Sequence, residues 1–285
     1  MHDQGLHHKR LHISQLTGKH SSLQVYSSYL ICHSKEPPFF TFPKLSKIRG
    51  IVHAIFTRHG GVSHSPFDSL NVSHAVGDRH EDVEENLKRI RNAVSIEHLV
   101  AMEQVHGSRV VSLRKGEIGG HTVIPDCDGL VTDTPKVTLM VKQADCQGVI
   151  LLDPGKGVLG MAHCGWRGNV SGILAKIVAA MVQDFGCNPA DLHVAIGPSL
   201  GPCCAEFVDY HKIFPEEFAR FQVKENHFDL WAISRWQLVG AGVKEENIEV
   251  AGICTRCRSD IFFSYRKKRD TGRFATVAML SYGAL

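Results

Sequence analysis

The stretch VKQADCQGVILLDPGKGVLGMAHCGWRGN, residues 141–169, decides the fold of this chain. It contains two short apolar runs, residues 149–152 and 158–161, each bounded by turn-forming residues, a pattern typical of buried strands. The DPGKG segment between them predicts a turn, so we expect the two runs to pair as a hairpin. Such a hairpin brings Cys146, which precedes the first run, and His163, which follows the second, to the same end of a sheet. We therefore expect a functional site at this sheet edge.

The segment after the hairpin predicts a helix that starts beside the same edge. GWRG, residues 165–168, places two glycines around Trp166 and Arg167, and Asn169 suits the N-cap position of a helix. The apolar residues that then recur at helical spacing are Val170, Leu174, Ile177, Val178, Met181, Val182 and Phe185. A thiol, an imidazole, a guanidinium and a helix N-terminus are thus predicted to converge.

Composition limits the classes of protein to which the chain can belong. Hydrophobic residues make up 43% and charged residues 21% of its 285 residues, which fits a globular protein with a sizeable core. The net charge of +3 gives no reason to expect nucleic acid or an anionic membrane surface as a partner. No segment approaches the roughly 20 apolar residues of a membrane span. The polar start MHDQGLHHKR lacks the apolar region of a signal peptide, and the nine cysteines show no regular spacing, so we expect a cytoplasmic protein with free thiols.

The order of expected elements predicts the fold class. Strands and helices alternate without a strict βαβ rhythm, and neither a linker nor an internal repeat divides the chain. We therefore predict an α+β fold of mixed α/β character, a single domain in which stacked mixed β-sheets are flanked by helices. Residues 1–50 are assigned to an N-terminal extension or to lead-in strands.

Three residues could close a metal site: His106, Cys146 and His163. Zinc favours nitrogen and sulfur ligands, and three protein ligands leave a fourth position for water or substrate. Imidazole and thiolate also suit copper, but a multicopper site needs paired histidines of the HxH type, which the middle of the chain lacks. The spacing of the three residues matches no short motif, and His106 taken alone is equally compatible with a structural role.

Several other polar segments each allow two interpretations. Arg58, in RHGG, offers a planar fork of donors for phosphate or carboxylate, or it is an exposed arginine at a plain turn. Asp128, in DCDG, suits a metal or general-acid role, or an acidic turn before a strand. The basic run at residues 266–269 indicates a solvated hairpin end in which one arginine could be functional.

The remaining cysteine motifs are interpreted as structural. Cys254 and Cys257 form a lone CxxC motif with no second CxxC pair to complete a zinc knuckle. Cys203 and Cys204 are adjacent, and adjacent cysteines rarely pair with each other. We interpret these residues as buried small thiols.

Eight motifs that occur in order carry a family resemblance. They are RHGGVS (58–63), SLNVSHAVGD (69–78), EQVHG (103–107), DCDGLVT (126–132), QADCQGVILLD (143–153), AHCGWRG (162–168), IGPSLGPCC (196–204) and FFSYRKKRDTGR (262–273). Together they resemble the YfiH-type laccase-domain family, whose members were once labelled polyphenol oxidases and are now recognised as purine nucleoside phosphorylases. The resemblance extends from about residue 51 to the C-terminus.

The resemblance implies a catalytic domain over residues 51–285 and a specific metal site. The family's zinc ligands are the histidine of QVHG, the cysteine of ADC and the histidine of AHxGWRG, which correspond to His106, Cys146 and His163. The implied activities are phosphorolysis of adenosine, inosine, guanosine and methylthioadenosine, together with deamination of adenosine. The implied partners are therefore purine nucleosides and phosphate, with zinc rather than copper as cofactor and a monomer or homodimer as the assembly.

The resemblance also suggests roles for five further residues. We expect phosphate at Arg58 and at Arg167, because a helix N-terminus beside Arg167 would favour an anion. Asn71 is a candidate for hydrogen bonding to ribose or phosphate. Asp128 or Asp145 would transfer protons or orient a metal ligand.

Other functions remain compatible with the sequence. Cys146 and His163 also resemble the Cys–His pair of a cysteine hydrolase, and the fold is related to the deamidase domain of a cytotoxic necrotizing factor, so an amidase is an alternative. His106 distinguishes the metal site from the Cys–His hydrolase, because a metal site needs this histidine and a Cys–His hydrolase does not. A copper polyphenol oxidase and a non-catalytic zinc-binding protein are further alternatives.

Overall fold

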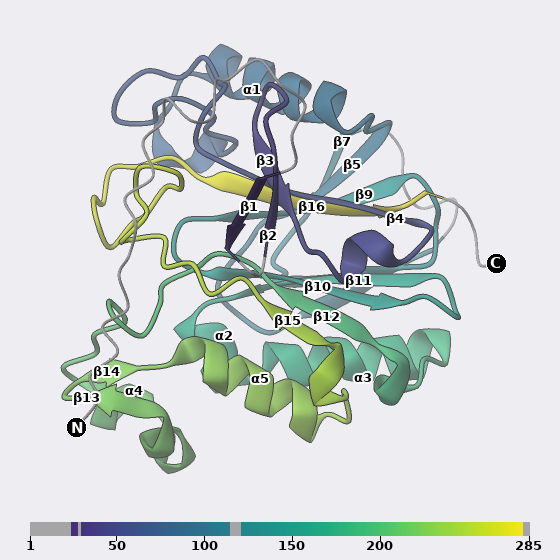
Figure 1. The fold of residues 1–285 in the computed structure, drawn as a ribbon, viewed down its shortest axis with the longest axis vertical. Coiled ribbons are helices and arrows are strands. Elements are labelled where there is room, and N and C mark those ends of the chain that lie inside the picture. Colours follow the sequence, from purple (N-terminus) through teal and green to yellow (C-terminus); the bar gives the residue numbers. More distant parts are fainter. Residues whose placement is uncertain (1–23, 28–29, 115–120, 282–285) are drawn as a thin grey trace.

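Two mixed β-sheets are stacked face to face, and helices cover their outer faces (Figure 1). The computed structural model describes residues 24–27, 30–114 and 121–281. The prediction of a single body of stacked mixed sheets flanked by helices is confirmed. None of the helices among these residues is both long enough and apolar enough to cross a membrane.

The larger sheet has eight strands in the order β1-β2-β3-β4-β16-β9-β5-β7. Its strands are β1 (Gln24–Ser27), β2 (Leu30–His33), β3 (Phe39–Thr41), β4 (Ile51–Phe56), β16 (Phe274–Leu280), β9 (Val137–Gln143), β5 (His98–Met102) and β7 (His121–Ile124). The strand β5 pairs in parallel with both β7 and β9, whereas the other pairs of this sheet are antiparallel. Three strands that precede residue 51 belong to this sheet, so lead-in strands extend the fold on the N-terminal side.

The smaller sheet has six strands in the order β15-β12-β10-β11-β8-β6. Its strands are β15 (Ile248–Val250), β12 (His193–Ile196), β10 (Gln147–Asp153), β11 (Val158–Cys164), β8 (Gly129–Thr132) and β6 (Val110–Leu113). The strands β13 (Gln222–Lys224) and β14 (His227–Phe228) form a separate two-stranded ribbon.

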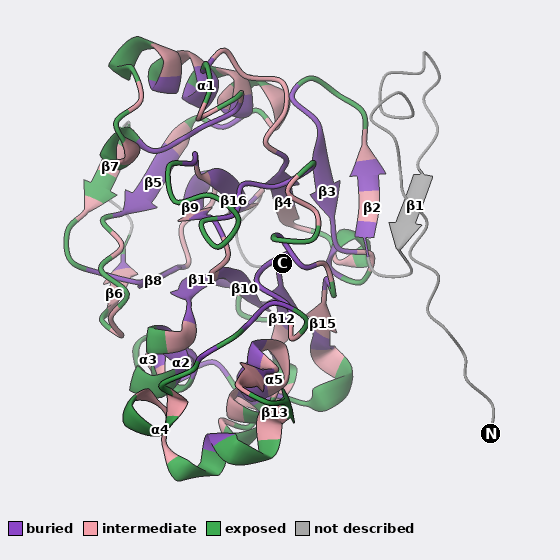
Figure 2. Cartoon of the chain, turned by 90° about the vertical axis from the view of Figure 1, so that its left-hand side faces the viewer, coloured by how far each residue is buried: buried purple, intermediate pink, exposed green. Residues whose placement is uncertain are grey.

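The helices form the outer layers. They are α1 (His80–Ala93), α2 (Trp166–Ser171), α3 (Ile173–Phe185), α4 (Tyr210–Ile213) and α5 (Leu230–Gly240), with short 3₁₀ segments at Leu45–Lys47, His74–Val76, Pro189–Asp191, Glu216–Phe221 and Glu245–Asn247. The helix α1 covers the eight-stranded sheet, and α3 and α5 cover the six-stranded sheet (Figure 1). Most strands are buried, and the outward turns of the helices are exposed (Figure 2). This separation follows from the apolar stripe that each helix turns towards its sheet.

The predicted hairpin is confirmed, and it lies at the centre of the six-stranded sheet. Strands β10 and β11 pair antiparallel, with Gln147 opposite Cys164 and Gly148 opposite His163. All seven residues of each strand are buried, because β10 and β11 pack against the other sheet on one face and against α3 on the other. The chain crosses between the sheets at residues 144–146, immediately before β10, which places Cys146 at the edge where both sheets end.

The predicted N-cap at Asn169 is wrong. The helix α2 starts at Trp166 with Gly165 at the N-cap, and a left-handed Gly172 separates it from α3. Asn169 is buried inside α2, where its Nδ2 donates to Ser234 Oγ at 2.9 Å. A buried partner on α5 therefore determines the role of this asparagine, which its local sequence could not show.

Candidate active site

A cavity of about 490 Å³ opens at the sheet edge where β10 begins and β11 ends. Its walls come from segments far apart in the sequence: residues 73–76, 103–106, 142–147 and 163–167, together with Leu200, Phe207, Leu230, Tyr265, Arg266 and Arg273. Residues 144–146, which link β9 to β10, are part of this lining. A site built from so many segments at one sheet edge is typical of a ligand pocket.

His106, Cys146 and His163 meet in this cavity. One ligand atom from each lies within 4.8 Å of the others, and the two imidazole rings contact edge to face with centroids 4.9 Å apart. His163 is buried in β11, Cys146 is partly exposed to the cavity, and His106 comes from the exposed loop after β5. The structure thus brings together the three residues that the sequence placed in one metal site.

Asp128 supports the ring of His163 and the backbone of the loop that carries His106. Its carboxylate is fully buried, and its Oδ1 accepts the proton of His163 Nδ1 at 2.8 Å. The same carboxylate accepts backbone N–H groups of the loop that carries His106: His106 N donates at 3.1 Å and Gly107 N at 2.7 Å. These bonds hold His106 in a left-handed conformation with φ of 60°. A single carboxylate therefore orients the ring of His163 through Nδ1, which leaves Nε2 pointing away from Asp128, and shapes the loop of His106.

The residues fit a metal ion of the zinc type. Sulfur and imidazole nitrogen are the ligands that zinc prefers, and a buried carboxylate behind a ligating histidine is the usual support. Space for the thiol depends on Gly165, because a Cβ atom there would lie 2.6 Å from Cys146 Sγ. Three protein ligands would leave a fourth position for water or substrate, as in catalytic zinc sites.

The same contacts change the proton affinities of the thiol and the imidazole. Burial alone would raise the pKa of the Cys146 thiol, but His163 and His106 outweigh it and lower this pKa to about 6. Burial would lower the pKa of His163, but the Cys146 thiolate and the Asp128 carboxylate raise it to about 9. The pKa of Asp128 is lowered, because hydrogen bonds from His163 and from Gly107 N outweigh its burial. Cys146 is therefore a thiolate at neutral pH, which is the form that binds metals.

Cationic and aromatic side chains line the rest of the cavity. The cationic ones are Lys142, Arg167, Arg266 and Arg273, and the aromatic ones are Trp166, Phe207 and Tyr265. Each of the three arginines lies near an aromatic ring of the cavity. The distances from the guanidinium carbon to the ring centroid are 4.5 Å for Arg167 and Trp166, 4.9 Å for Arg266 and Phe207, and 6.0 Å for Arg273 and Tyr265. This wall suits an anion next to a flat aromatic ligand.

Two of the predicted substrate-binding residues lie outside the cavity lining. Arg58 donates from Nε and Nη2 to the Asp68 carbonyl and from Nη1 to the Ser259 carbonyl, at 2.7–2.9 Å. Asn71 is fully buried, and its Oδ1 accepts the backbone N–H of Arg273 at 2.9 Å. Arg58 thus joins two loops, and Asn71 supports the strand entry that carries Arg273. Arg167, the third predicted residue, lines the cavity.

Asp145 lines the cavity, but all its donors come from the protein. Its Oδ1 accepts from Thr255 Oγ1 at 2.7 Å and Ser264 Oγ at 2.6 Å, and its Oδ2 accepts from Arg266 N at 2.6 Å. Its backbone is left-handed, with φ of 91°. Asp145 therefore connects residues 264–266 to the segment between β9 and β10.

Sequence reasoning missed several lining residues. Lys142, Phe207, Tyr265 and Arg273 were not singled out, although Tyr265 and Arg273 lie in the FFSYRKKRDTGR motif. Arg266 comes from the basic run in which one functional arginine was expected, and it is the member of that run that lines the cavity. The pairing of β16 with β9 and the bonds from Ser264 and Arg266 to Asp145 bring this C-terminal motif next to Cys146.

The interpretation of Cys203 and Cys204 as buried small thiols is confirmed for Cys204, which is buried, and wrong for Cys203, which is exposed. The two also lie next to Cys254 and Cys257, which the sequence did not predict. Their four sulfurs lie within 4.8 Å of one another, and Cys203 and Cys257 are exposed. The adjacent cysteines supply the second pair that the CxxC motif lacked. A separation of about fifty residues between the pairs hid this from the sequence.

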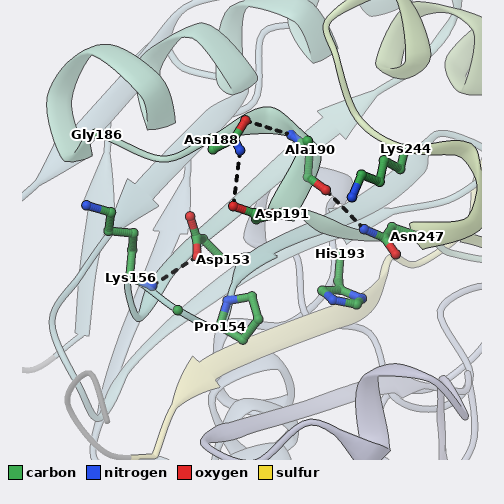
Figure 3. Close-up of a pocket in the computed structure, with 11 residues that line it drawn as sticks. Asp153, Pro154, Lys156, Gly186, Asn188, Ala190, Asp191, His193, Lys244 and Asn247 are labelled. Atoms are coloured by element: carbon green, nitrogen blue, oxygen red, sulfur yellow. Dashed lines mark hydrogen bonds between the residues drawn. The ribbon is translucent and has the colours of Figure 1, made fainter.

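A second hollow of about 560 Å³ lies at the opposite end of the hairpin (Figure 3). Its polar groups bond mainly to one another: Asn188 Nδ2 donates to Asp191 Oδ2 at 3.1 Å, and Lys156 N donates to Asp153 Oδ1 at 2.9 Å (Figure 3). It holds none of the three candidate metal-ligand groups. We therefore assign the candidate active site to the first cavity.

Comparison with known proteins identifies the family of the chain. A sequence profile described as "Multi-copper polyphenol oxidoreductase laccase" matches residues 52–281. The chain belongs to this laccase-domain family. The match covers every residue of the His106–Cys146–His163 group and both cysteine pairs.

Relatives within the laccase-domain family carry a different activity in their names. The chain is 36% identical over 238 residues to purine nucleoside phosphorylase YlmD of Geobacillus stearothermophilus, covering 78% of this chain and 87% of the relative. It is 31% identical over 246 residues to purine nucleoside phosphorylase YfiH of Escherichia coli, covering 84% and 97%. The crystal structure of a hypothetical protein YfiH from Bacillus licheniformis superposes with a TM-score of 0.80 at 30% identity, over 87% of this chain and 98% of the other. The family resemblance read from the motifs is confirmed.

Proposed function

We propose that this protein is a zinc-dependent purine nucleoside phosphorylase. The observation that carries the proposal is the position of His106, Cys146 and His163 in a cavity lined by four cationic side chains. Phosphorolysis needs an anionic nucleophile and a neutral nucleoside in one site, and this cavity offers cations beside aromatic surfaces. The names of the relatives support the same activity.

Arg167, Arg266 and Arg273 are the groups that we assign to phosphate. Guanidinium groups bind phosphate oxygens through paired N–H donors. An oxygen of the bound phosphate attacks C1′ of the ribose while the bond from C1′ to the purine nitrogen breaks. Holding phosphate and nucleoside in line supplies much of the rate of such a reaction. The products are the free base, which takes up a proton, and ribose 1-phosphate.

We assign the base to the aromatic side chains of the cavity and the metal to the group of His106, Cys146 and His163. Phe207 and Tyr265 provide faces on which a purine ring can stack. A Zn²⁺ ion at His106, Cys146 and His163 would supply a Lewis acid. Asp128 holds the ring of His163 and the loop of His106, and Asp145 holds the segment of Arg266. We therefore assign positioning roles to both acids rather than proton transfer. Arg58 and Asn71 do not contact the substrate in this proposal; they support the loops around the cavity.

We also propose deamination of adenosine as a second activity of the same site. In this reaction water replaces the exocyclic amino group of the purine, and ammonia is released. The reaction requires no phosphate. Release of ammonia from adenosine in phosphate-free buffer is therefore its separate measurement.

A cysteine hydrolase is the second candidate, because Cys146, His163 and Asp128 also have the order of a catalytic triad. In both readings His163 Nδ1 faces the carboxylate and Nε2 remains for the sulfur. His106 favours the metal site, since its ligand atom lies within 4.8 Å of those of Cys146 and His163. A catalytic triad does not require a second histidine. A metal-bound thiolate is protected from alkylation until a chelator is added, whereas a free catalytic thiolate reacts at once.

The decisive experiment is incubation of the purified protein with inosine or adenosine, with and without phosphate. We expect free base and ribose 1-phosphate only with phosphate. Cys146→Ala should abolish both products, and Cys187→Ala, which removes a buried thiol far from the cavity, should leave them unchanged. Absence of base release from every purine nucleoside, in protein shown to contain zinc, would refute the proposal.

A further inference from the structure

Four cysteines outside the proposed active site share one small volume. Cys203 and Cys204 lie in the turn that starts at Gly201, where Cys204 N donates to Gly201 O at 2.9 Å. Cys254 and Cys257 lie in the segment after β15. The sulfur of Cys257 is 3.5 Å from that of Cys203 and 3.5 Å from that of Cys204. All four sulfurs lie within 4.8 Å of one another.

These separations match a tetrahedral metal site. With metal–sulfur bonds of about 2.3 Å, the corners of a tetrahedron are about 3.8 Å apart. Bonded disulfide sulfurs would be about 2.05 Å apart, and all four cysteines are free thiols. Four thiolates in tetrahedral arrangement select zinc or an iron–sulfur centre.

The exposure of two of the four cysteine residues argues against a purely apolar cluster. Free cysteines that act as small hydrophobic residues are among the most buried side chains. The pattern holds for Cys32, Cys164 and Cys187, but Cys203 and Cys257 are exposed. Clustered exposed thiols gain little from packing, whereas a metal ion gains from every one of them.

A cation stands next to the cluster. Arg256 lies inside the CxxC motif, and its Nη1 donates to Cys204 Sγ at 3.4 Å. The guanidinium places a positive charge beside the four sulfurs. Four thiolates around a divalent cation carry a net charge of −2, and Arg256 offsets part of this charge.

We propose that Cys203, Cys204, Cys254 and Cys257 form a second metal site, a closed tetrathiolate site for Zn²⁺. It differs from the site in the cavity in having four protein ligands and hence no position for substrate. Closed sites of this kind are structural. The inference does not depend on the nucleoside activity.

The loops that this metal would join form part of the cavity wall. Thr255 N donates to Ser199 O at 3.0 Å, and Ser199 N donates to Ile253 O at 3.2 Å, so the two segments already run side by side. Leu200 and Phe207 flank the adjacent cysteines and line the cavity. A metal at the four sulfurs would therefore fasten this wall in place.

The test is metal content, measured by elemental analysis on full-length protein purified under reducing conditions with Zn²⁺ supplied. We expect two zinc ions per chain. Cys203→Ser with Cys257→Ser should retain one ion, Cys146→Ala should retain the other, and Cys187→Ser should retain both as the matched thiol control. One ion per chain in the wild type, unchanged in the Cys203→Ser and Cys257→Ser variant, overturns the proposal. Iron in place of zinc overturns the assignment of the metal.

A second measurement on the wild type covers the case in which the double variant does not fold. Iodoacetamide labelling, mapped by mass spectrometry, should leave the exposed Cys203 and Cys257 unmodified until a strong chelator is added. Cobalt loading should give intense thiolate-to-Co²⁺ charge-transfer absorption that persists in Cys146→Ala. Rapid labelling of both cysteines without chelator, or a disulfide between them, overturns the proposal.

Discussion

Substitution of Gly165 by alanine tests the geometry of the cavity metal site with a single methyl group. The added Cβ would lie 2.6 Å from Cys146 Sγ, whereas non-bonded heavy atoms prefer roughly 3.5–4.0 Å. The sulfur must therefore move by about 1 Å. Metal–ligand distances are held to about 0.2 Å, so the displaced thiolate can no longer ligate together with both imidazoles. Since even supporting residues change metal affinity by about 10–100-fold, we expect zinc affinity to fall by at least about 100-fold.

The backbone and the fold should tolerate this change. Gly165 has φ of −91°, which alanine adopts without strain, and the atom in the way is the end of a side chain rather than backbone. We expect the free energy of unfolding of the metal-free protein to change by about 1 kcal/mol or less. Gly240→Ala is the matched control, because a Cβ there meets nothing within 4 Å.

Isothermal titration with Zn²⁺ and phosphorolysis of inosine are the two assays for Gly165→Ala. We expect weak zinc binding and a rate at least about 100-fold lower, since a 1 Å misplacement alone costs about that factor. Gly240→Ala should match the wild type in both assays. Wild-type zinc affinity in a folded Gly165→Ala protein would refute the three-ligand geometry.

Three further predictions follow from the same contacts. Asp128→Asn should weaken zinc binding by about 10–100-fold, because an amide cannot accept all the protons that this carboxylate accepts; unchanged binding would remove its supporting role. Arg273→Ala should raise the KM for phosphate by about 10-fold or more, whereas Arg58→Ala should lower the Tm and leave this KM unchanged, and the opposite pattern would restore the first assignment of Arg58. In metal-free protein, the rate of Cys146 alkylation should be constant above about pH 7 and should decrease as the pH falls through about 6. The reason is that the lowered pKa keeps the thiol ionised down to that pH. A midpoint near the ordinary thiol pKa of 9 would contradict the contacts of Cys146 with His163 and His106.

The sequence predicted the parts of the site that depend on local pattern. The apolar runs around DPGKG defined β10 and β11, and the antiparallel register then placed Cys146 near His163. Alternation and turn residues suffice for this, because a hairpin is formed by neighbouring residues. His106 joined them through the family motif, and its position depends on Asp128, whose buried bonds no local pattern reveals.

The errors share one physical cause, which is contact between segments far apart in the chain. Arg58 stands in a glycine-rich motif that suits an anion, but the carbonyls of Asp68 and Ser259 take its donors. The cysteine pairs are separated by about fifty residues and meet only because Ser199 and Cys254 pair as a parallel bridge. Side chains with several donors can satisfy either a ligand or the protein, and only the folded structure decides between them.

Asp145 connects the two candidate metal sites. It lies beside Cys146 in the sequence, and Thr255, next to Cys254, donates to its carboxylate at 2.7 Å. The left-handed conformation of Asp145 costs about 1–2 kcal/mol, because it is not a glycine. The three hydrogen bonds to its carboxylate offset this cost only while the loops that carry the donors keep their positions. A metal at the four cysteines would hold the Thr255 loop, and so would maintain the strained link that presents the Cys146 thiolate to the cavity. If occupied in this way, the proposed second site would contribute to the first through backbone geometry, although the two share no ligand.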